Sequence, residues 1–174
     1  MTTERFGIYK VGGKDVTVVG DDIQVGKATP DFSVQAVDWS VKRGLADTAG
    51  KVRIIASVPS LDTEVCDRET RRFNMEAASL SKDIVIEVIS TDLPYTQKRW
   101  CGAAGVDQVM VLSDHMTAEF SEKYAVLVKE RRICRRAVFV VGRDDKAVYA
   151  AYMLASGDEP NYAEVIEAAK KALG

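Results

Sequence analysis

The sequence is poor in the residues that build metal centres and disulfide scaffolds. Its 174 residues include one histidine, His115, and three cysteines, which stand alone at positions 66, 101 and 134. A structural zinc site takes about four Cys or His ligands in close pairs, and disulfide-held secreted domains are shorter and richer in cysteine. We therefore expect no metal, no cofactor and no disulfide framework.

The sequence also lacks long apolar runs and a surplus of one charge. No segment reaches the roughly 18 apolar residues that span a bilayer, and residues 1–16 contain no apolar core of the signal-peptide type. Lys and Arg number 24 against 26 Asp and Glu, whereas nucleic-acid and anionic-membrane binders show a basic excess. We expect no membrane or nucleic-acid partner, and a location in the cytoplasm. In that reducing compartment a cysteine pair is more often catalytic than structural.

The length is that of one domain, because domains typically run to about 100–200 residues, and we treat residues 1–174 as one unit. Residues 1–20 predict an N-terminal β-hairpin extension that turns at Gly12-Gly13. Apolar runs of strand length and segments of helical spacing then alternate. The predicted strands cover 52–58, 84–90, 109–112, 137–141 and 147–153; the predicted helices cover 66–80, 93–104, 117–124, capped by Thr117, and the segment from 160.

This order predicts an α/β fold with helices flanking a mixed central sheet. The strand–helix–strand connections give parallel pairs, and the hairpin that turns at 142–145 adds an antiparallel pair. A thioredoxin-like topology fits the order, although the order alone admits others.

The residues with the clearest chemistry follow the strand that ends at Pro59. Thr63 is a good helix N-cap residue, which would place Cys66 third in the helix. Free N–H groups and the helix dipole stabilise a thiolate there, and the Thr63 hydroxyl can reach the same turn. An isolated T-x-x-C pattern also fits a capped helix with an inert, buried cysteine.

The wider sequence favours the reactive interpretation. The blocks PSLDTEVCDRETRRFN (59–74), ISTDLPYTQKRWCGAAG (89–105) and RRAVFVV (135–141) resemble the bacterial thiol peroxidases, which are atypical two-cysteine peroxiredoxins. GKATPDF (26–32) and EPNYAEV (159–165) match as well, so the resemblance covers nearly the whole chain. It implies a thioredoxin-like fold of the peroxiredoxin type.

The resemblance also implies roles for individual residues. Cys66 corresponds to the peroxidatic cysteine and Cys101 to the resolving cysteine, which would join in an intramolecular disulfide. Pro59 would shield the thiolate, and Thr63 would hydrogen-bond to the sulfur and the peroxide. Both cysteines lie in predicted helices, so we expect one or both helical turns to unwind before the sulfurs can bond.

The family's active-site arginine falls at Arg136, with Arg135 as the neighbouring alternative. Consecutive strand side chains point to opposite faces, so only one of the two can face the peroxidatic cysteine. The implied activity is thioredoxin-dependent reduction of hydrogen peroxide and organic hydroperoxides by a homodimer. A peroxide sensor or thiol redox relay would use the same cysteines, and an inert thioredoxin-like binding domain is a third hypothesis.

Three further residues lie outside this pattern. Cys134, in the basic run 131–136, is most simply a packed strand residue, although nearby arginines could lower its pKa and give it a second resolving role. His115 lacks a partner motif, and we expect a surface position for it. Ala125 stands where the family usually has glycine, which questions any backbone conformation there that needs glycine.

Overall fold

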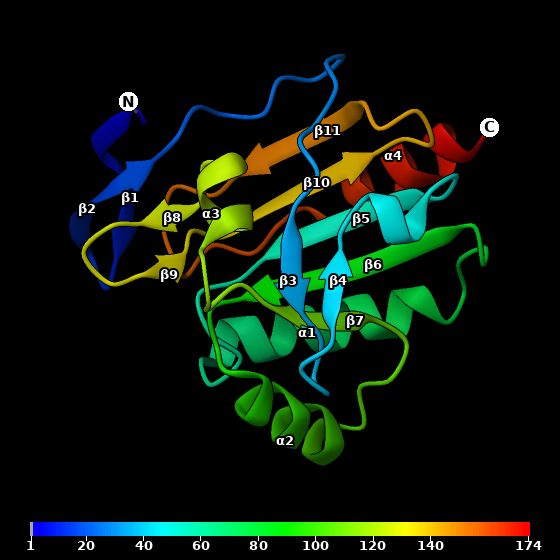
Figure 1. Ribbon diagram of the computed structural model, residues 1–174, viewed down its shortest axis with the longest axis horizontal. Helices are drawn as coiled ribbons and strands as arrows, with labels where there is room; N and C mark the ends of the chain where they lie inside the picture. The colour runs from blue at the N-terminus through cyan, green and yellow to red at the C-terminus, as the bar shows by residue number, and fades with distance from the viewer. Residues whose placement is uncertain (1) are drawn as a thin grey trace.

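The structure, a computed structural model, describes residues 2–174 and contains a seven-stranded mixed sheet (Figure 1). Its order is β11-β10-β5-β6-β7-β3-β4; β5, β6 and β7 run parallel and the other pairs are antiparallel. The strands are β3 (Ser33–Gln35), β4 (Val41–Arg43), β5 (Val52–Ser57), β6 (Ile84–Ser90), β7 (Met110–Ser113), β10 (Ala137–Val141) and β11 (Ala147–Tyr152). The predicted mixed sheet is confirmed.

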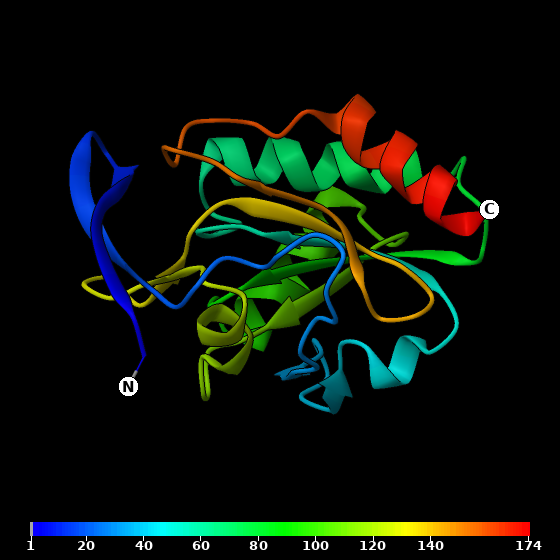
Figure 2. The same cartoon turned by 90° about the horizontal axis from the view of Figure 1, so that it is seen from above.

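Helices cover both faces of this sheet, as the view from above shows (Figure 2). The helices are α1 (Glu64–Ala77), α2 (Pro94–Ala104), α3 (Glu119–Lys123), α4 (Tyr162–Leu173) and the short 3-10 helix η1 (Ala46–Thr48). Helices α1 and α4 lie on one face, while η1 and α3 lie on the other. Strand β5 is therefore buried along its whole length, which explains why most of its residues are apolar. No helix within residues 2–174 is long and apolar enough to cross a membrane.

A second sheet of four strands, in the order β1-β2-β8-β9, lies beside the first. Its strands are β1 (Glu4–Val11), β2 (Lys14–Val19), β8 (Leu127–Val128) and β9 (Ile133–Cys134). The first two form the predicted N-terminal hairpin. The Lys10 backbone also bonds to the 154–156 segment, through Leu154 O at 3.0 Å and Ser156 N at 2.9 Å, and this places the hairpin beside the end of β11.

The start of α3 differs from the prediction. The helix begins at Glu119 rather than at 117, and Thr117 Oγ1 accepts only a 3.3 Å bond from the Glu119 N–H. The buried Asp114 carboxylate accepts the N–H groups of Phe120 at 3.2 Å and Ser121 at 2.8 Å. Thr117 is therefore not the main cap, because a carboxylate from the preceding loop satisfies the first-turn donors.

Ala125 adopts the left-handed backbone conformation that glycine favours, with φ of 57°. A Cβ on the neighbouring Gly20 would lie 2.6 Å from the Glu122 carbonyl oxygen and 3.1 Å from Ala125 Cα. Alanine at 125 therefore keeps the left-handed turn, and glycine is required at position 20, directly after β2, where the two backbones approach closely.

Candidate active site

Cys66 lies where β5 passes through a short loop into α1. Thr63 is the N-cap residue, with extended φ and ψ of −94° and 146°, and α1 begins at Glu64, so Cys66 is third in the helix as predicted. The Cys66 side chain is fully buried. The local sequence sets this geometry, since Thr63 ends the extended loop and the first-turn N–H groups and helix dipole surround the sulfur.

The Thr63 hydroxyl does not make the predicted bond to sulfur. It donates to the Ser60 carbonyl at 2.9 Å and makes no side-chain capping bond. This bond closes the loop before the helix and turns the hydroxyl away from the first helical turn. Thr63 and Pro59 nevertheless line a cavity of about 300 Å³, together with Arg136.

Arg136 connects the end of β9 to the Cys66 helix. Its Nη2 donates to Cys66 Sγ at 3.1 Å, and its Nη1 donates to Glu69 Oε2 at 2.5 Å. The Ser156 carbonyl accepts from Nε at 3.1 Å and from Nη2 at 2.8 Å. The guanidinium is thus fixed by three partners in the protein interior, with one N–H group aimed at the sulfur.

Arg135 and Arg136 connect β9 to β10, and their side chains have different partners. Arg135 Nε donates to the Met153 carbonyl at 3.0 Å, and the Arg135 guanidinium lies over the rings of Tyr152 and Tyr9, at 4.9 and 5.5 Å from their centroids. Of the two arginines that the sequence leaves open, only Arg136 contacts Cys66.

Glu69 belongs to this site and was missed by the sequence reasoning. Burial raises the pKa of Glu69 to about 7, against the opposing effect of the adjacent Arg136. Its Oε1 has no hydrogen-bond partner among residues 2–174. The spacing could have revealed it, because residues i and i+3 share a helix face and Glu69 follows Cys66 by three. The Ser156 contact is a backbone carbonyl and leaves no signal in the sequence.

Cys101 lies in α2, half-buried, and burial raises the pKa of its thiol. It lines a second cavity of about 300 Å³ with residues of β7 and with Lys98. The two predicted partners, Cys66 and Cys101, are both free thiols in this structure. Their helices are neighbours, joined by a hydrogen bond of 2.9 Å from Trp100 Nε1 to Asp67 Oδ1.

Cys134 and His115 lie outside the site. Cys134 is fully buried in β9, where its sulfur is 3.3 Å from Ser121 Oγ, and burial followed by the charge of Asp114 raises its pKa. The suggestion that nearby arginines lower this pKa is therefore wrong. His115 is only half-exposed: its Nδ1 is 3.0 Å from Ser113 Oγ and its ring packs edge-on against Trp39.

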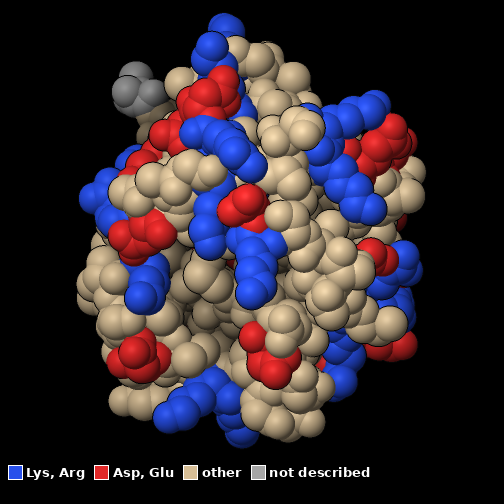
Figure 3. All heavy atoms as spheres, turned by 90° about the vertical axis from the view of Figure 1, so that its right-hand side faces the viewer, with Lys and Arg blue, Asp and Glu red and all other residues tan. Residues whose placement is uncertain are grey.

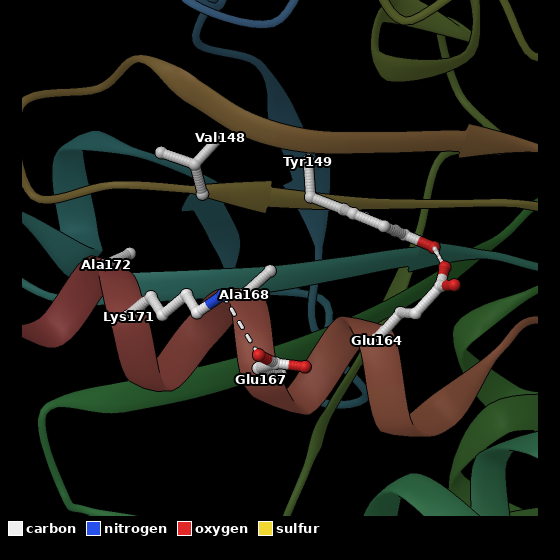
Figure 4. A pocket seen from close by; sticks show the side chains of 7 residues that line it. All are labelled: Val148, Tyr149, Glu164, Glu167, Ala168, Lys171 and Ala172. Atoms are coloured by element: carbon white, nitrogen blue, oxygen red, sulfur yellow. Dashed lines mark hydrogen bonds and ion pairs between the residues drawn. The ribbon is translucent and has the colours of Figure 1, made fainter.

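Another hollow, of about 460 Å³, lies between α4 and β11 and contains no cysteine (Figure 4). Its polar groups pair with one another: Tyr149 with Glu164 at 3.3 Å and Lys171 with Glu167 at 2.9 Å. On the side of the molecule shown in Figure 3, acidic and basic side chains are interspersed rather than gathered by sign. Neither the hollow nor this surface is a stronger candidate for the active site than the surroundings of Cys66.

The sequence is similar to known proteins over most of its length. Residues 25–150 match the model of the AhpC/TSA family. The chain is 49% identical to a thiol peroxidase of Bacillus subtilis, over 91% of this chain and 93% of the relative. It is 48% identical to a thiol peroxidase of Oceanobacillus iheyensis, over 87% and 91%.

Solved structures show the same fold. The crystal structure of a peroxiredoxin-like protein from Aquifex aeolicus superposes with a TM-score of 0.88 at 34% identity, covering 98% of both chains. A thiol peroxidase from Chromobacterium violaceum superposes with a TM-score of 0.81 at 19% identity, covering 94% of this chain and 95% of the other. The fold is thus the thioredoxin-like fold of the peroxiredoxin type, and the chain belongs to the AhpC/TSA family and, within it, to the thiol peroxidases.

Proposed function

We propose that this protein is a thioredoxin-dependent peroxidase that reduces hydrogen peroxide and organic hydroperoxides with Cys66. The observation that carries the proposal is the 3.1 Å contact from Arg136 Nη2 to Cys66 Sγ, made at a helix N-terminus beside a cavity. A cation and a helix dipole both stabilise a thiolate, and the cavity gives space for a small substrate. The family membership supports the same chemistry.

In the first step the Cys66 thiolate attacks one peroxide oxygen. An S–O bond forms, the O–O bond breaks, and the departing oxygen takes a proton and leaves as water or an alcohol, with Cys66 as sulfenic acid. Ionising a thiol gives only a modest gain in rate, because nucleophilicity falls as the thiol becomes more acidic. We therefore assign the larger effect to donors aimed at the O–O bond, supplied by Arg136 and the Cys66 backbone N–H.

Pro59 and Thr63 have supporting roles in this proposal. Both line the cavity beside the Cys66 helix, so Pro59 can exclude water from the sulfur. The Thr63 hydroxyl donates to Ser60 in this structure, and rotation about its χ1 bond would direct it to a bound peroxide.

In the second step Cys101 attacks the Cys66 sulfenic acid, which releases water and leaves a Cys66–Cys101 disulfide. Thioredoxin then reduces this disulfide by thiol–disulfide exchange. The neighbouring positions of α1 and α2 support this pairing, as does the location of the third cysteine, Cys134, in β9 with its sulfur against Ser121.

We also propose a homodimer in the cytoplasm, built from one domain in each copy. Large apolar side chains are exposed beyond the carboxyl ends of β6 and β7: Leu93, the N-cap of α2, is 46% exposed, Tyr95 in the first turn of α2 70%, and Met116 in the loop after β7 62%. The loop that leads to Cys66 follows β5, which runs parallel to β6 and β7, so it lies at the same end of the sheet. Exposed apolar patches commonly mark protein contacts, so a second copy would lie beside the active site.

A coupled assay with thioredoxin, thioredoxin reductase and NADPH tests the proposal. We expect turnover with both kinds of peroxide, none in Cys66→Ser, and one turnover followed by a stall in Cys101→Ser. Mass mapping of the oxidised protein should find a 66–101 linkage.

The same assay separates the alternatives. Rapid loss of the Cys66 thiol without thioredoxin-coupled turnover would instead favour a sensor or relay. If peroxide does not consume the Cys66 thiol, all reactive roles fail. Sustained turnover by Cys101→Ser would show that another thiol resolves the sulfenic acid.

A further inference from the structure

A small cluster of side chains joins the helices that carry the two reactive cysteines. Trp100 Nε1 in α2 donates to Asp67 Oδ1 in α1 at 2.9 Å, and Arg71 Nε donates to Asp67 Oδ2 at 2.8 Å. The Arg71 guanidinium lies 5.7 Å from the centroid of the Trp100 ring and donates to the Ala104 carbonyl, at the end of α2, at 3.3 Å. We call Asp67, Arg71 and Trp100 the interhelix clip.

While the clip is closed, each helix directs its cysteine elsewhere. Asp67 directly follows Cys66, and Trp100 directly precedes Cys101. Successive residues of an α-helix point about 100° apart, so each cysteine points in a different direction from the clip residue beside it, although both cysteines pack against one apolar core. The contacts agree, because Cys66 Sγ bonds to Arg136 of the sheet layer and Cys101 lines a cavity with β7.

A disulfide has strict geometric requirements, and in this structure both thiols are free, with different partners around each sulfur. The sulfurs must come within about 2.05 Å and the two Cβ atoms within about 3.5–4.5 Å. Two cysteines whose side chains point apart cannot be bridged without movement of the backbone. Bringing the sulfurs together therefore requires α1 or α2 to turn or unwind, which breaks the contacts of the clip.

We infer that the interhelix clip controls the rate at which the Cys66 sulfenic acid is converted to the disulfide; this rests on the proposed function. In that step the Cys101 sulfur attacks the Cys66 sulfur, an S–S bond forms and the S–O bond breaks. The hydroxyl group leaves with the thiol proton as water. Asp67, Arg71 and Trp100 are positioning residues, since they act through the two helices.

The clip lies at the protein surface, where it can open. The side chains of Asp67 and Arg71 are 35% and 48% exposed, and such ion pairs are only weakly stabilising because water competes for both partners. The clip is thus able to favour the folded helices during peroxide reduction and still open in each cycle. A sulfenic acid that waits for opening can meet a second peroxide and become sulfinic acid, so the clip also sets the tendency to over-oxidation.

Two variants weaken the clip in different ways. Trp100→Phe removes the indole N–H and keeps an aromatic ring, while Asp67→Asn removes the charge that Arg71 pairs with. Glu76→Gln is the matched control, because Glu76 also pairs with an arginine one turn away in α1, Arg72 at 2.9 Å, and that pair does not reach α2.

The reduced proteins are mixed with one equivalent of hydrogen peroxide and quenched over time with an alkylating reagent and a sulfenic-acid trap. Intact mass then separates thiol, sulfenic acid and disulfide. We expect disulfide formation to be about fivefold faster in Trp100→Phe and Asp67→Asn, from the loss of one partly exposed charge-assisted bond. Sulfenic-acid formation should change less than twofold, and sulfinic acid at high peroxide should fall by a similar fivefold factor. Glu76→Gln should behave as the wild type.

Faster disulfide formation in either variant that keeps the wild-type circular dichroism spectrum supports the inference, because a merely structural role would slow both steps. No acceleration in both variants, while the wild type does form the 66–101 disulfide, overturns the role of the clip and leaves the proposed function standing. A wild-type protein that forms no 66–101 disulfide overturns the resolving step and the clip together.

Discussion

Cys66 and Cys134 are equally buried, yet they lie in opposite electrostatic surroundings. Both side chains are 0% exposed. Cys66 has an arginine N–H at 3.1 Å and lies in the first turn of a 14-residue helix. Cys134 lies in a two-residue strand, and its neighbours are a serine hydroxyl at 3.3 Å and the acidic Asp114, whose charge adds to burial in raising the pKa of Cys134. The two cysteines therefore differ in the charges around their sulfurs and not in their burial.

The two cysteines also show that closeness in the sequence does not predict which charged side chain contacts a thiol. Cys134 is two residues from Arg136, yet the Arg136 guanidinium bonds to Cys66, which is 70 positions away. Arg135, the immediate neighbour of Cys134, is stacked between two tyrosines. The charged group that affects each thiol is therefore the one that the tertiary fold places beside its sulfur, and not the one nearest in the sequence.

Removal of each sulfur gives the largest expected contrast. Cys66→Ser should abolish peroxide turnover, because the nucleophile is lost. Cys134→Ala should keep turnover within about twofold of the wild type, since only a packed side chain of a buried strand is changed. Steady-state turnover in the thioredoxin-coupled assay measures both, and a loss of activity in a folded Cys134→Ala protein would remove the distinction between the two cysteines.

Thiol labelling under native conditions should separate them by about a thousandfold. Alkylation requires a thiolate and access. Both side chains are buried, but Cys66 contacts Arg136, which lines a cavity, whereas Cys134 becomes accessible only when β9 opens. Mass spectrometry after timed exposure to iodoacetamide at neutral pH would follow each site, and equal labelling rates in the folded protein would contradict the electrostatic explanation.

The sequence could predict the parts of this contrast that depend on local rules. The placement of Cys66 in the first turn of a helix follows from Thr63 and the preceding strand. Alternation of side chains predicts only that one of Arg135 and Arg136 can face Cys66, and the fold decides that it is Arg136. Five of the seven strands of the central sheet, β5, β6, β7, β10 and β11, follow from apolar runs in the sequence, and the N-terminal hairpin follows from Gly12-Gly13.

The remainder depends on contacts between distant segments, which spacing does not encode. Strands β8 and β9 have two residues each, too few to show a period. The cap of α3 is supplied by Asp114 from the preceding loop, and the Ser156 carbonyl reaches Arg136 from beyond β11. The rotation of the Thr63 hydroxyl toward Ser60 is likewise set by the folded loop.

Substitution of the arginine should have the next largest effect. Arg136→Lys keeps a positive charge but loses the planar fork that reaches Cys66, Glu69 and Ser156 together. We expect the second-order rate constant for Cys66 oxidation, measured by stopped flow, to fall about 100-fold, as for the loss of one aimed donor. Arg135→Lys is the matched control and should change that rate less than threefold. Similar losses in both variants would show that the Cys66 thiolate depends on positive charge in this region and not on the N–H group that Arg136 directs at the sulfur.

The smallest expected effect concerns the buried carboxylates beside the two cysteines. Burial raises the pKa of Glu69 to about 7 from an ordinary value near 4.5, so between these values the folded state binds more protons than the unfolded state. Protonation of Glu69 therefore stabilises the folded state fully below about pH 4.5, and this contribution is lost as the pH rises through 7. The amide side chain in the Glu69→Gln variant does not titrate, so this variant lacks that pH dependence. Urea unfolding from pH 5 to 8 should therefore show the free energy of unfolding of the wild type declining relative to Glu69→Gln by about 2–3 kcal/mol.

Asp114 beside Cys134 provides the comparison for this measurement. Burial also raises the pKa of Asp114, so Asp114→Asn should remove a pH dependence of the same sign. The two variants should differ in reactivity, because only Glu69 pairs with the arginine that contacts a cysteine sulfur. A Glu69→Gln protein should lose the pH dependence of Cys66 oxidation near neutrality, and Asp114→Asn should keep it. If both variants retain the wild-type pH profile of oxidation, Glu69 serves the stability of α1 alone, and the contrast between the cysteines rests on Arg136 and the helix terminus.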